Sequence, residues 1–178
     1  MNLHRTPFGG RHFECFSEDP LLTARIGVAY VRGLQGQGVG ATVKHFVGND
    51  SETERMSVDV RIDERTLREL YLAPFEAIVR EAGAWAVMAA YNGVNGSTMT
   101  ESPLLRAILH DEWGYDGLVV SDWTATRSVE PAARTASSRA PPHGPNRSAG
   151  PGMARSSAAR AAGPTDRVAV QSDTTRPS

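Results

Sequence analysis

Three short groups of polar residues follow apolar segments of this sequence, at points where chemistry could take place. They are Lys44-His45, Tyr91-Asn92 and Ser121-Asp122-Trp123. In parallel α/β folds the reactive side chains lie at the carboxyl ends of strands. Taken singly, each group has a structural explanation: a lysine can reach solvent, a histidine can be a structural donor, and an aspartate can cap a helix. Their occurrence together at equivalent positions favours a functional site, because a packed core disfavours such side chains.

The elements that would hold these groups alternate along the chain. Short, continuously apolar runs predict strands at 41–46, 84–90 and 118–121. Apolar residues at helical spacing predict three helices, which begin at Asp19-Pro20, Asp63 and Ser102-Pro103. This alternation predicts an α/β fold with a parallel sheet and right-handed crossovers. A doubly wound sheet and a (β/α)8 barrel both fit, although three units are too few to close a barrel of about 250 residues.

Residues 131–178 differ sharply in composition from the rest of the chain. Ala, Arg, Pro, Ser and Gly make up 36 of these 48 residues, and Leu, Ile, Phe, Tyr and Trp do not occur. Such a segment buries too little apolar surface to offset the entropy of ordering its backbone, so we expect a disordered tail from residue 128 onward. Its seven arginines are scattered among prolines without aromatic residues, which does not indicate a nucleic-acid partner.

Cysteine content and hydropathy restrict the class of protein further. Cys15 is the single cysteine, so no intrachain disulfide can form, and we interpret it as a half-buried small side chain. No apolar run approaches the roughly 20 residues that span a membrane, so we expect no membrane partner. No basic-then-apolar leader is visible, which places the protein in the cytoplasm by default. No G-x-G-x-x-G or Walker pattern follows a strand, which argues against nucleotide binding.

Four segments together resemble, in order and spacing, the N-terminal catalytic barrel of glycoside hydrolase family 3, and in particular its β-glucosidase-like members. They are GRHFECFSEDP (10–20), KHFVGNDSETER (44–55), AAYNGVNG (89–96) and LLRAILHDEWGYDGLVVSDW (104–123). The Lys-His pair and the terminal Ser-Asp-Trp are specific when they occur together. The resemblance implies a partial (β/α)8 TIM-type barrel with parallel strands over residues 1–127, followed by the disordered tail over 128–178.

The resemblance also implies a role for each polar residue at the strand ends. Asp122 corresponds to the catalytic nucleophile of that family. The positions that surround the sugar in the −1 subsite correspond to Arg11, Lys44, His45 and Tyr91. Trp123, which follows the nucleophile, resembles an aromatic wall for the sugar. We therefore expect these side chains to converge at the carboxyl ends of adjacent strands, with Arg11 nearby.

The reaction that the resemblance implies needs two carboxylates. A retaining glycosidase uses one to attack the anomeric carbon and a second, about 5 Å away, to protonate the leaving oxygen. The loop after Lys44 lacks the PGHG and DSH motifs of the N-acetylglucosaminidase branch, so the resemblance favours the β-glucosidase-like branch, whose acid is a glutamate on a following domain. We interpret Glu14, Glu52 and Glu54 as structural or loop carboxylates, and we expect the acid to lie outside this chain.

The implied function is retaining hydrolysis of terminal β-linked glucosides, with xylosides and arabinofuranosides as alternative substrates. The implied partner is a small carbohydrate, and the resemblance implies neither a cofactor nor a catalytic metal. Without the acid, we expect the chain to be inactive on its own. The alternative interpretation is a carbohydrate-binding pseudoenzyme or an inert gene remnant.

The resemblance stops within a few residues of Trp123, beside the expected nucleophile. The tail has the composition of a GC-rich gene read out of frame, and a single lysine against 18 arginines fits such a gene. We therefore expect the residues from about Thr126 onward to be a frame-shifted read-through, with a genuine disordered linker as the alternative.

Overall fold

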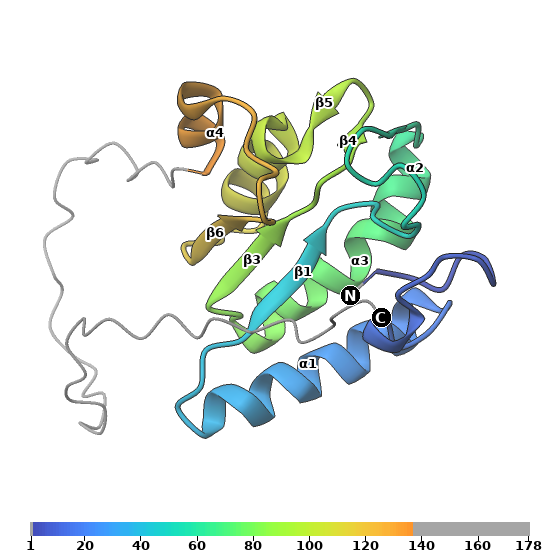
Figure 1. Ribbon diagram of the computed structural model, residues 1–178. Helices are drawn as coiled ribbons and strands as arrows, with labels where there is room; N and C mark the ends of the chain where they lie inside the picture. The colour runs from blue at the N-terminus through green and yellow to red at the C-terminus, as the bar shows by residue number, and fades with distance from the viewer. Residues whose placement is uncertain (1, 137–178) are drawn as a thin grey trace, which may run out of the picture. The chain divides into compact units, whose positions relative to one another are not determined.

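Three parallel strands form the sheet that carries the predicted site residues in the computed structural model, which describes residues 2–136 (Figure 1). The strands are β1 (Thr42–Phe46), β3 (Ala86–Ala89) and β6 (Leu118–Ser121), paired in the order β1-β3-β6. All three lie within the segments predicted to be strands, and their parallel pairing confirms the expected sheet. The register of β1 against β3 shifts between Lys44 and Phe46, where the Lys44–His45 and Phe46–Val47 peptide bonds are cis.

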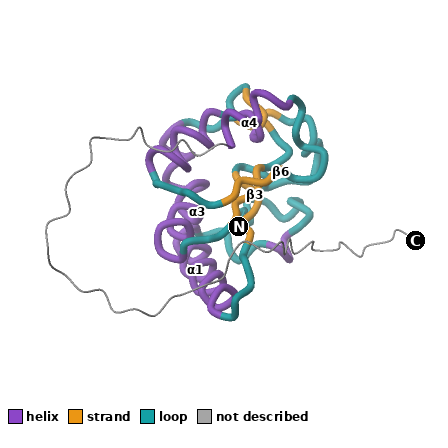
Figure 2. The backbone as a smooth tube through the Cα atoms, turned by 90° about the vertical axis from the view of Figure 1, so that its left-hand side faces the viewer, coloured by secondary structure: helices purple, strands orange, loops and turns teal. Residues whose placement is uncertain are grey.

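Helical segments precede each strand, as the alternation predicts. The first is α1 (Pro20–Gly36), whose N-terminus is capped by the Asp19 carboxylate, which accepts hydrogen bonds from the backbone N–H groups of Leu21 (2.7 Å) and Leu22 (3.2 Å). The segments between β1 and β3 are α2 (Glu64–Thr66), η2 (Leu67–Leu72), α3 (Ala73–Ala77) and η3 (Ile78–Ala82). The π-helical segment η5 (Leu105–Glu112) precedes β6. Figure 2 shows α1 and α3 together on one face of the sheet.

Aromatic rings join the sheet to this helical layer. The Phe46 ring of β1 makes T-shaped contacts with Phe75 of α3, at 5.3 Å between ring centroids, and with Trp113 at the end of η5, at 6.2 Å. All three rings are buried. Because these contacts bind β1 to the helices before β3 and β6, they hold the carboxyl ends of the three strands in fixed relative positions.

A second, smaller sheet was not predicted from the sequence. It consists of β2 (Asp59–Val60), β4 (Gly93–Val94) and β5 (Ser97–Thr98), with β4 parallel to β2 and antiparallel to β5. Asn95 and Gly96 connect β4 to β5 with φ values of 50° and 94°. A two-residue Asn-Gly turn with both φ angles positive is the preferred connection of a tight hairpin. The signal was therefore present in the sequence.

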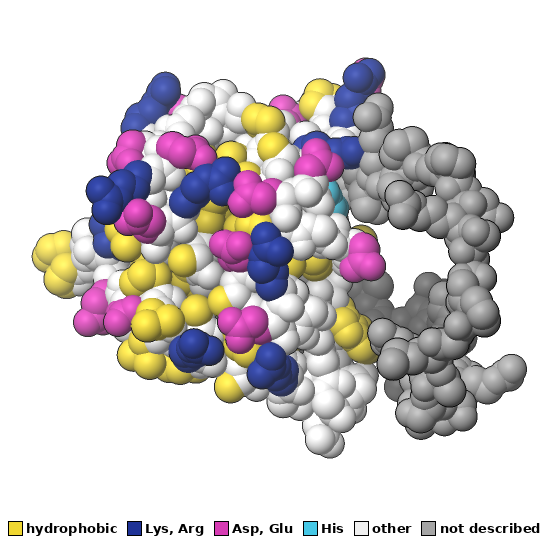
Figure 3. Space-filling view, turned by 180° about the vertical axis from the view of Figure 1, so that it is seen from behind, with side chains coloured by type: hydrophobic (Ala, Val, Ile, Leu, Met, Phe, Trp, Pro, Cys, Tyr) yellow, Lys and Arg dark blue, Asp and Glu magenta, His cyan; other side chains and the backbone are white. Residues whose placement is uncertain are grey.

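The exposed side of the helices carries ion pairs on the segments before β3 and β6 and apolar side chains such as Leu21 and Tyr30 on α1. Arg68 is 2.8 Å from Glu112, and Arg80 is 2.8 Å from Glu76. Figure 3 shows acidic and basic side chains interspersed with apolar ones on one side of the molecule. Among the described helices, none combines the length and the hydropathy that a membrane crossing needs.

The start of the expected tail is helical, which differs from the prediction of disorder from residue 128 onward. Helix α4 spans Val129–Ala136. Its Arg134 pairs with Glu130 one turn away, and the Thr135 hydroxyl donates a hydrogen bond of 2.9 Å to the Thr100 carbonyl. Alanine-rich segments favour helices, and this tertiary contact adds to that preference. The rest of the predicted tail, residues 137–178, lies outside the described residues.

Candidate active site

The carboxyl end of the β1-β3-β6 sheet brings the predicted strand-end residues together. Lys44 and His45 belong to β1, while Tyr91 and Asp122 lie just beyond the ends of β3 and β6. The Asp122 backbone N–H donates a hydrogen bond of 3.1 Å to the carbonyl of Ala89, which links the last residue of β3 to the residue after β6. His45 Nε2 lies 3.4 Å from Asp122 Oδ2. The convergence expected from the strand-end positions is therefore present in the structure.

The two carboxylate oxygens of Asp122 have different environments. Oδ1 accepts a hydrogen bond of 2.8 Å from the backbone N–H of Trp123. Oδ2 is buried and has no hydrogen-bond partner within residues 2–136. Buried polar atoms are nearly always hydrogen-bonded, so an exception in a native site calls for a functional explanation. An unpartnered carboxylate oxygen at this position is free to accept a hydrogen bond from a ligand or to form a bond with it.

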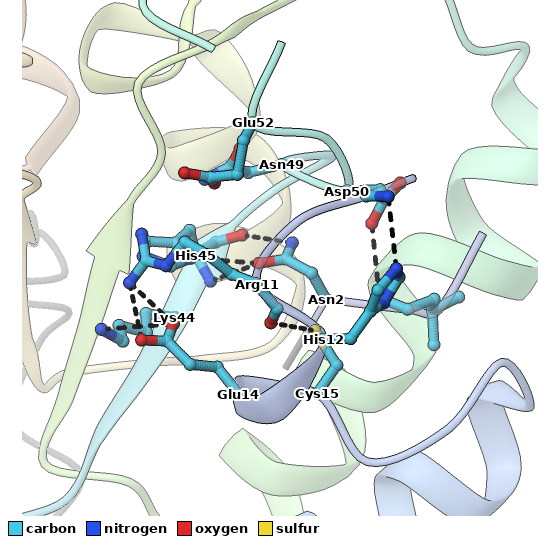
Figure 4. Close-up of a pocket in the computed structure, with 12 residues that line it drawn as sticks. Asn2, Arg11, His12, Glu14, Cys15, Lys44, His45, Asn49, Asp50 and Glu52 are labelled. Carbon is cyan, nitrogen blue, oxygen red and sulfur yellow. Dashed lines mark hydrogen bonds and ion pairs between the residues drawn. The ribbon is translucent and has the colours of Figure 1, made fainter. Parts of the chain in front are cut away.

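Arg11 and Lys44 share one carboxylate partner, Glu14. Both Glu14 oxygens lie 2.7 Å from Arg11 Nη2, and Oε2 lies 3.6 Å from Lys44 Nζ (Figure 4). Burial alone would lower the pKa of Arg11, but the hydrogen bond and charge of Glu14, with the charges of Glu52 and Asp122, raise it above its ordinary value. Glu14 lies in the short helix η1 (His12–Glu14), and Arg11 is the residue before it. The segment around η1 thus places the Arg11 guanidinium at the site, and its Glu14 orients the Lys44 ammonium group.

His45 is held by Asn2, a residue that no sequence motif identified. The His45 backbone N–H donates to Asn2 Oδ1 at 3.0 Å, and Asn2 Nδ2 donates to the His45 carbonyl at 3.0 Å. The imidazole Nδ1 lies 3.1 Å from the same Oδ1. Burial, and secondarily the charges of Lys44 and Arg11, lower the pKa of His45 to about 2. The ring is therefore neutral at physiological pH.

The two aromatic residues of the predicted site differ in exposure: Tyr91 is buried and Trp123 is exposed. Tyr91 is buried, and its pKa is raised by burial and then by the negative charge of Asp122. The guanidinium of Arg55, which was not singled out from the sequence, lies 5.0 Å from the centre of the Tyr91 ring, within reach of a cation–π contact. Trp123 is 75% exposed, so its indole is available to solvent or to a ligand.

A small polar pocket adjoins these residues (Figure 4). Of the predicted residues, Arg11, Lys44 and His45 line it, whereas Tyr91, Asp122 and Trp123 do not. Its other lining residues are Asn2, Leu3, Gly9, His12, Glu14, Cys15, Asn49, Asp50 and Glu52. His45 connects the two groups because its Nε2 faces Asp122. Within residues 2–136, no three His, Cys, Asp or Glu side chains are grouped so that they could hold a metal ion.

The lowered pKa of His45 predicts how stability depends on pH. The His45 ring has a pKa of about 6.5 in the unfolded chain and of about 2 in the folded protein. Between these two pH values the unfolded ring therefore binds a proton and the folded ring does not. The stability that comes from burying the neutral ring is complete above about pH 6.5 and falls by up to about 1.4 kcal/mol for each pH unit below it. We therefore expect His45→Gln to flatten the decline in the free energy of unfolding between about pH 6.5 and about pH 4.5.

Urea unfolding of parent and variant across this range measures the effect. Asp50, whose pKa is raised by burial, is present in both proteins, so its contribution cancels in the comparison. Parallel pH profiles for the two proteins would contradict the assignment of a neutral buried ring.

The model of the glycosyl hydrolase family 3 N-terminal domain matches residues 1–140. A β-glucosidase of Rhizobium radiobacter is 55% identical over 130 residues, which cover 72% of this chain and 16% of that protein. An exo-α-(1→6)-L-arabinopyranosidase of Bifidobacterium longum is 48% identical over 126 residues, which cover 70% of this chain and 17% of that protein.

Solved structures show the same likeness in three dimensions. β-Glucosidase 3B of Thermotoga neapolitana in complex with glucose superposes with a TM-score of 0.75 at 46% identity, over 76% of this chain and 19% of that one. The fold is accordingly part of a TIM-type barrel, as the sequence predicts. The chain spans about a sixth of the length of the curated relatives named above.

Proposed function

Because the chain belongs to glycosyl hydrolase family 3, we propose that it carries the nucleophile of a retaining β-glucosidase site and that this nucleophile is Asp122. The observation that supports this most is the asymmetry of the Asp122 carboxylate. A backbone N–H orients Oδ1, while Oδ2 is buried and unpartnered within the described part of the chain. A nucleophile needs this combination of fixed geometry and one uncommitted lone pair.

The proposed reaction proceeds in two displacements at the anomeric carbon. An Asp122 oxygen forms a bond to that carbon while the bond to the leaving oxygen breaks, and a protonated acid gives its proton to the leaving oxygen. In the second step, the same group, now a base, takes a proton from water, whose oxygen replaces Asp122 at the carbon. The two steps regenerate both carboxyl groups and retain the configuration of the sugar.

The neighbouring side chains suit a sugar in this position. Arg11, Lys44 and Tyr91 offer hydrogen-bond donors to sugar hydroxyls, and His45 offers its Nε2, since its Nδ1 lies against Asn2 Oδ1. The exposed indole of Trp123 provides an apolar surface for the apolar face of a pyranose ring. The positive charge of Arg11 complements the negative charge of Asp122, which contributes to the raised pKa of Arg11.

The substrate class we propose is a terminal β-linked glucoside. The named β-glucosidase relatives favour it, and the arabinopyranosidase relative shows that this barrel segment also occurs in an enzyme named for another sugar. A substrate panel should therefore include an α-L-arabinopyranoside, together with the xylosides and arabinofuranosides that the family resemblance implies.

A chimera tests the proposal directly. Residues 1–125 of this chain replace the matching segment of the Rhizobium radiobacter β-glucosidase, so that the rest of a relative surrounds Asp122. Incubation with a 2-deoxy-2-fluoroglucoside, which forms a long-lived glycosyl-enzyme, followed by peptide mass spectrometry is expected to find the label on Asp122. Labelling of another carboxylate, such as Glu14 or Glu52, would overturn the assignment.

A further inference from the structure

The orientation of the Asn2 side-chain amide is determined by backbone groups. The His45 backbone N–H can only donate, so the amide atom 3.0 Å from it must be the oxygen. The His45 carbonyl can only accept, so the atom 3.0 Å from it must be the amide nitrogen. The reversed amide would place a donor against the N–H and an acceptor against the carbonyl. Asn2 Oδ1 is therefore the atom that faces the imidazole.

This orientation has a consequence for the proton of the neutral His45 ring. Nδ1 lies 3.1 Å from Asn2 Oδ1 in hydrogen-bonding geometry, and an amide oxygen can only accept. The proton therefore belongs on Nδ1, because a bare Nδ1 would set two acceptors against each other. A neutral imidazole carries one ring proton, so Nε2 is left as an acceptor.

Nε2 faces the unpartnered oxygen of Asp122. The two atoms are 3.4 Å apart, yet Asp122 Oδ2 has no hydrogen-bond partner among the described residues. With the proton on Nδ1, both atoms present lone pairs to the space between them. Two converging acceptors are costly in a buried site unless a donor serves them. The Tyr91 hydroxyl interacts with the Asp122 carboxylate, and a hydroxyl group of a ligand would supply a donor between Nε2 and Oδ2.

We propose that Asn2 is a positioning residue that sets the tautomer of His45, so that Nε2 accepts a hydrogen bond from a sugar hydroxyl and gives none to Asp122. The second effect leaves Oδ2 without a hydrogen bond from the imidazole, which would weaken it as a nucleophile. The sugar part of this inference rests on the proposed function, whereas the tautomer itself does not.

Nuclear magnetic resonance of the 178-residue chain with ¹⁵N-labelled histidine tests the tautomer without any substrate. Two-bond correlations between ring protons and ring nitrogens distinguish a protonated from a bare nitrogen. At neutral pH we expect His45 to carry its proton on Nδ1. His110 is an internal reference, because its Nδ1 lies 2.7 Å from the Tyr115 carbonyl, which can only accept.

Two variants separate the influence of Asn2 from that of Asp122. Asn2→Leu has nearly the same shape but no polar atoms, so Asp122 becomes the acceptor available to the ring, and we expect the proton to move to Nε2. Asp122→Asn removes the carboxylate and keeps Asn2, so we expect the proton to stay on Nδ1. The tautomer of His110 should be the same in all three proteins, which also reports that each is folded.

The outcomes are decisive even if one variant does not fold. A parent His45 with its proton on Nε2, or doubly protonated at neutral pH, overturns the proposal, as does a switch of tautomer in Asp122→Asn. If Asn2→Leu loses the folded His110 signals, the parent and Asp122→Asn spectra still decide. If the fluorosugar labels a residue other than Asp122 in the chimera, the proposed function is overturned while the tautomer result still stands. Failure of the proposed function can therefore be distinguished from failure of the tautomer proposal.

Discussion

Replacement of Asp122 by asparagine in the Rhizobium chimera is expected to lower kcat/KM for aryl β-glucosides by about 10⁴-fold or more, the scale on which loss of a covalent nucleophile acts. The amide is a poor nucleophile at the anomeric carbon, so the glycosyl-enzyme should not form. Asparagine keeps an oxygen that can accept the hydrogen bond from the Trp123 backbone N–H, so the local backbone should be preserved. Steady-state kinetics with an aryl glucoside and the absence of fluorosugar label measure the two effects.

Asp116→Asn is the matched control for this prediction. Asp116 is an exposed residue just before β6, at the opposite end of the strand from Asp122, and the chemical change is identical. We expect it to leave kcat/KM near the parental value. An Asp122→Asn chimera with a near-parental rate, or an Asp116→Asn chimera with an equal loss, would contradict the role of Asp122.

The 178-residue chain on its own is expected to hydrolyse p-nitrophenyl β-glucoside at least about 100-fold more slowly than the chimera, because acid catalysis typically contributes about 10²–10⁴-fold. The nearby carboxylates are already engaged by cations. Glu14 is bound by Arg11 at 2.7 Å, and Glu52 lies 2.8 Å from Arg55. A general acid must instead carry a proton and reach the leaving oxygen. The comparison is made on purified, folded protein at equal concentration.

Substrates with different leaving groups show whether the slow hydrolysis by the 178-residue chain comes from the lack of a general acid. A 2,4-dinitrophenyl glucoside leaves without protonation, so the difference between chain and chimera should shrink for this substrate if the acid is what the chain needs. If calorimetry detects glucose binding and the chain shows no turnover, the result would favour the alternative that the chain is a carbohydrate-binding pseudoenzyme. Turnover at the rate of the chimera would contradict the prediction, and Glu14→Gln and Glu52→Gln would then show which carboxylate acts as the acid.

The order of the elements and the positions of the strand ends were readable from the sequence because they depend on local patterns. Continuous apolar runs located β1, β3 and β6, and the Asp-Pro pair at residues 19–20 located the start of α1. Since parallel strands share one carboxyl edge, those positions alone predicted that residues 44, 45, 91 and 122 would meet. The turn at Asn95-Gly96, which closes the β4–β5 hairpin, is an equally local signal.

Helix α4 shows where composition misleads. An alanine-rich segment with few apolar residues resembles a disordered tail, but the eight residues of α4 are helical, with Glu130 paired to Arg134 and the Thr135 hydroxyl donating to the Thr100 carbonyl. Such a contact joins residues 35 positions apart, so it depends on how the intervening chain folds.

By itself, the sequence determined which residues stand at the carboxyl edge of the sheet, and only the tertiary structure decided which atoms face one another there. The hydrophobic pattern and the turn residues of a sequence assign a residue to one end of a strand. A hydrogen bond, however, requires two atoms about 3 Å apart in a suitable direction. Asn2 meets His45 across 43 positions, Glu14 binds Lys44 from a separate helix, and Arg55 lies over Tyr91 from a loop. These pairings join segments that lie far apart in the sequence, so no local pattern encodes them.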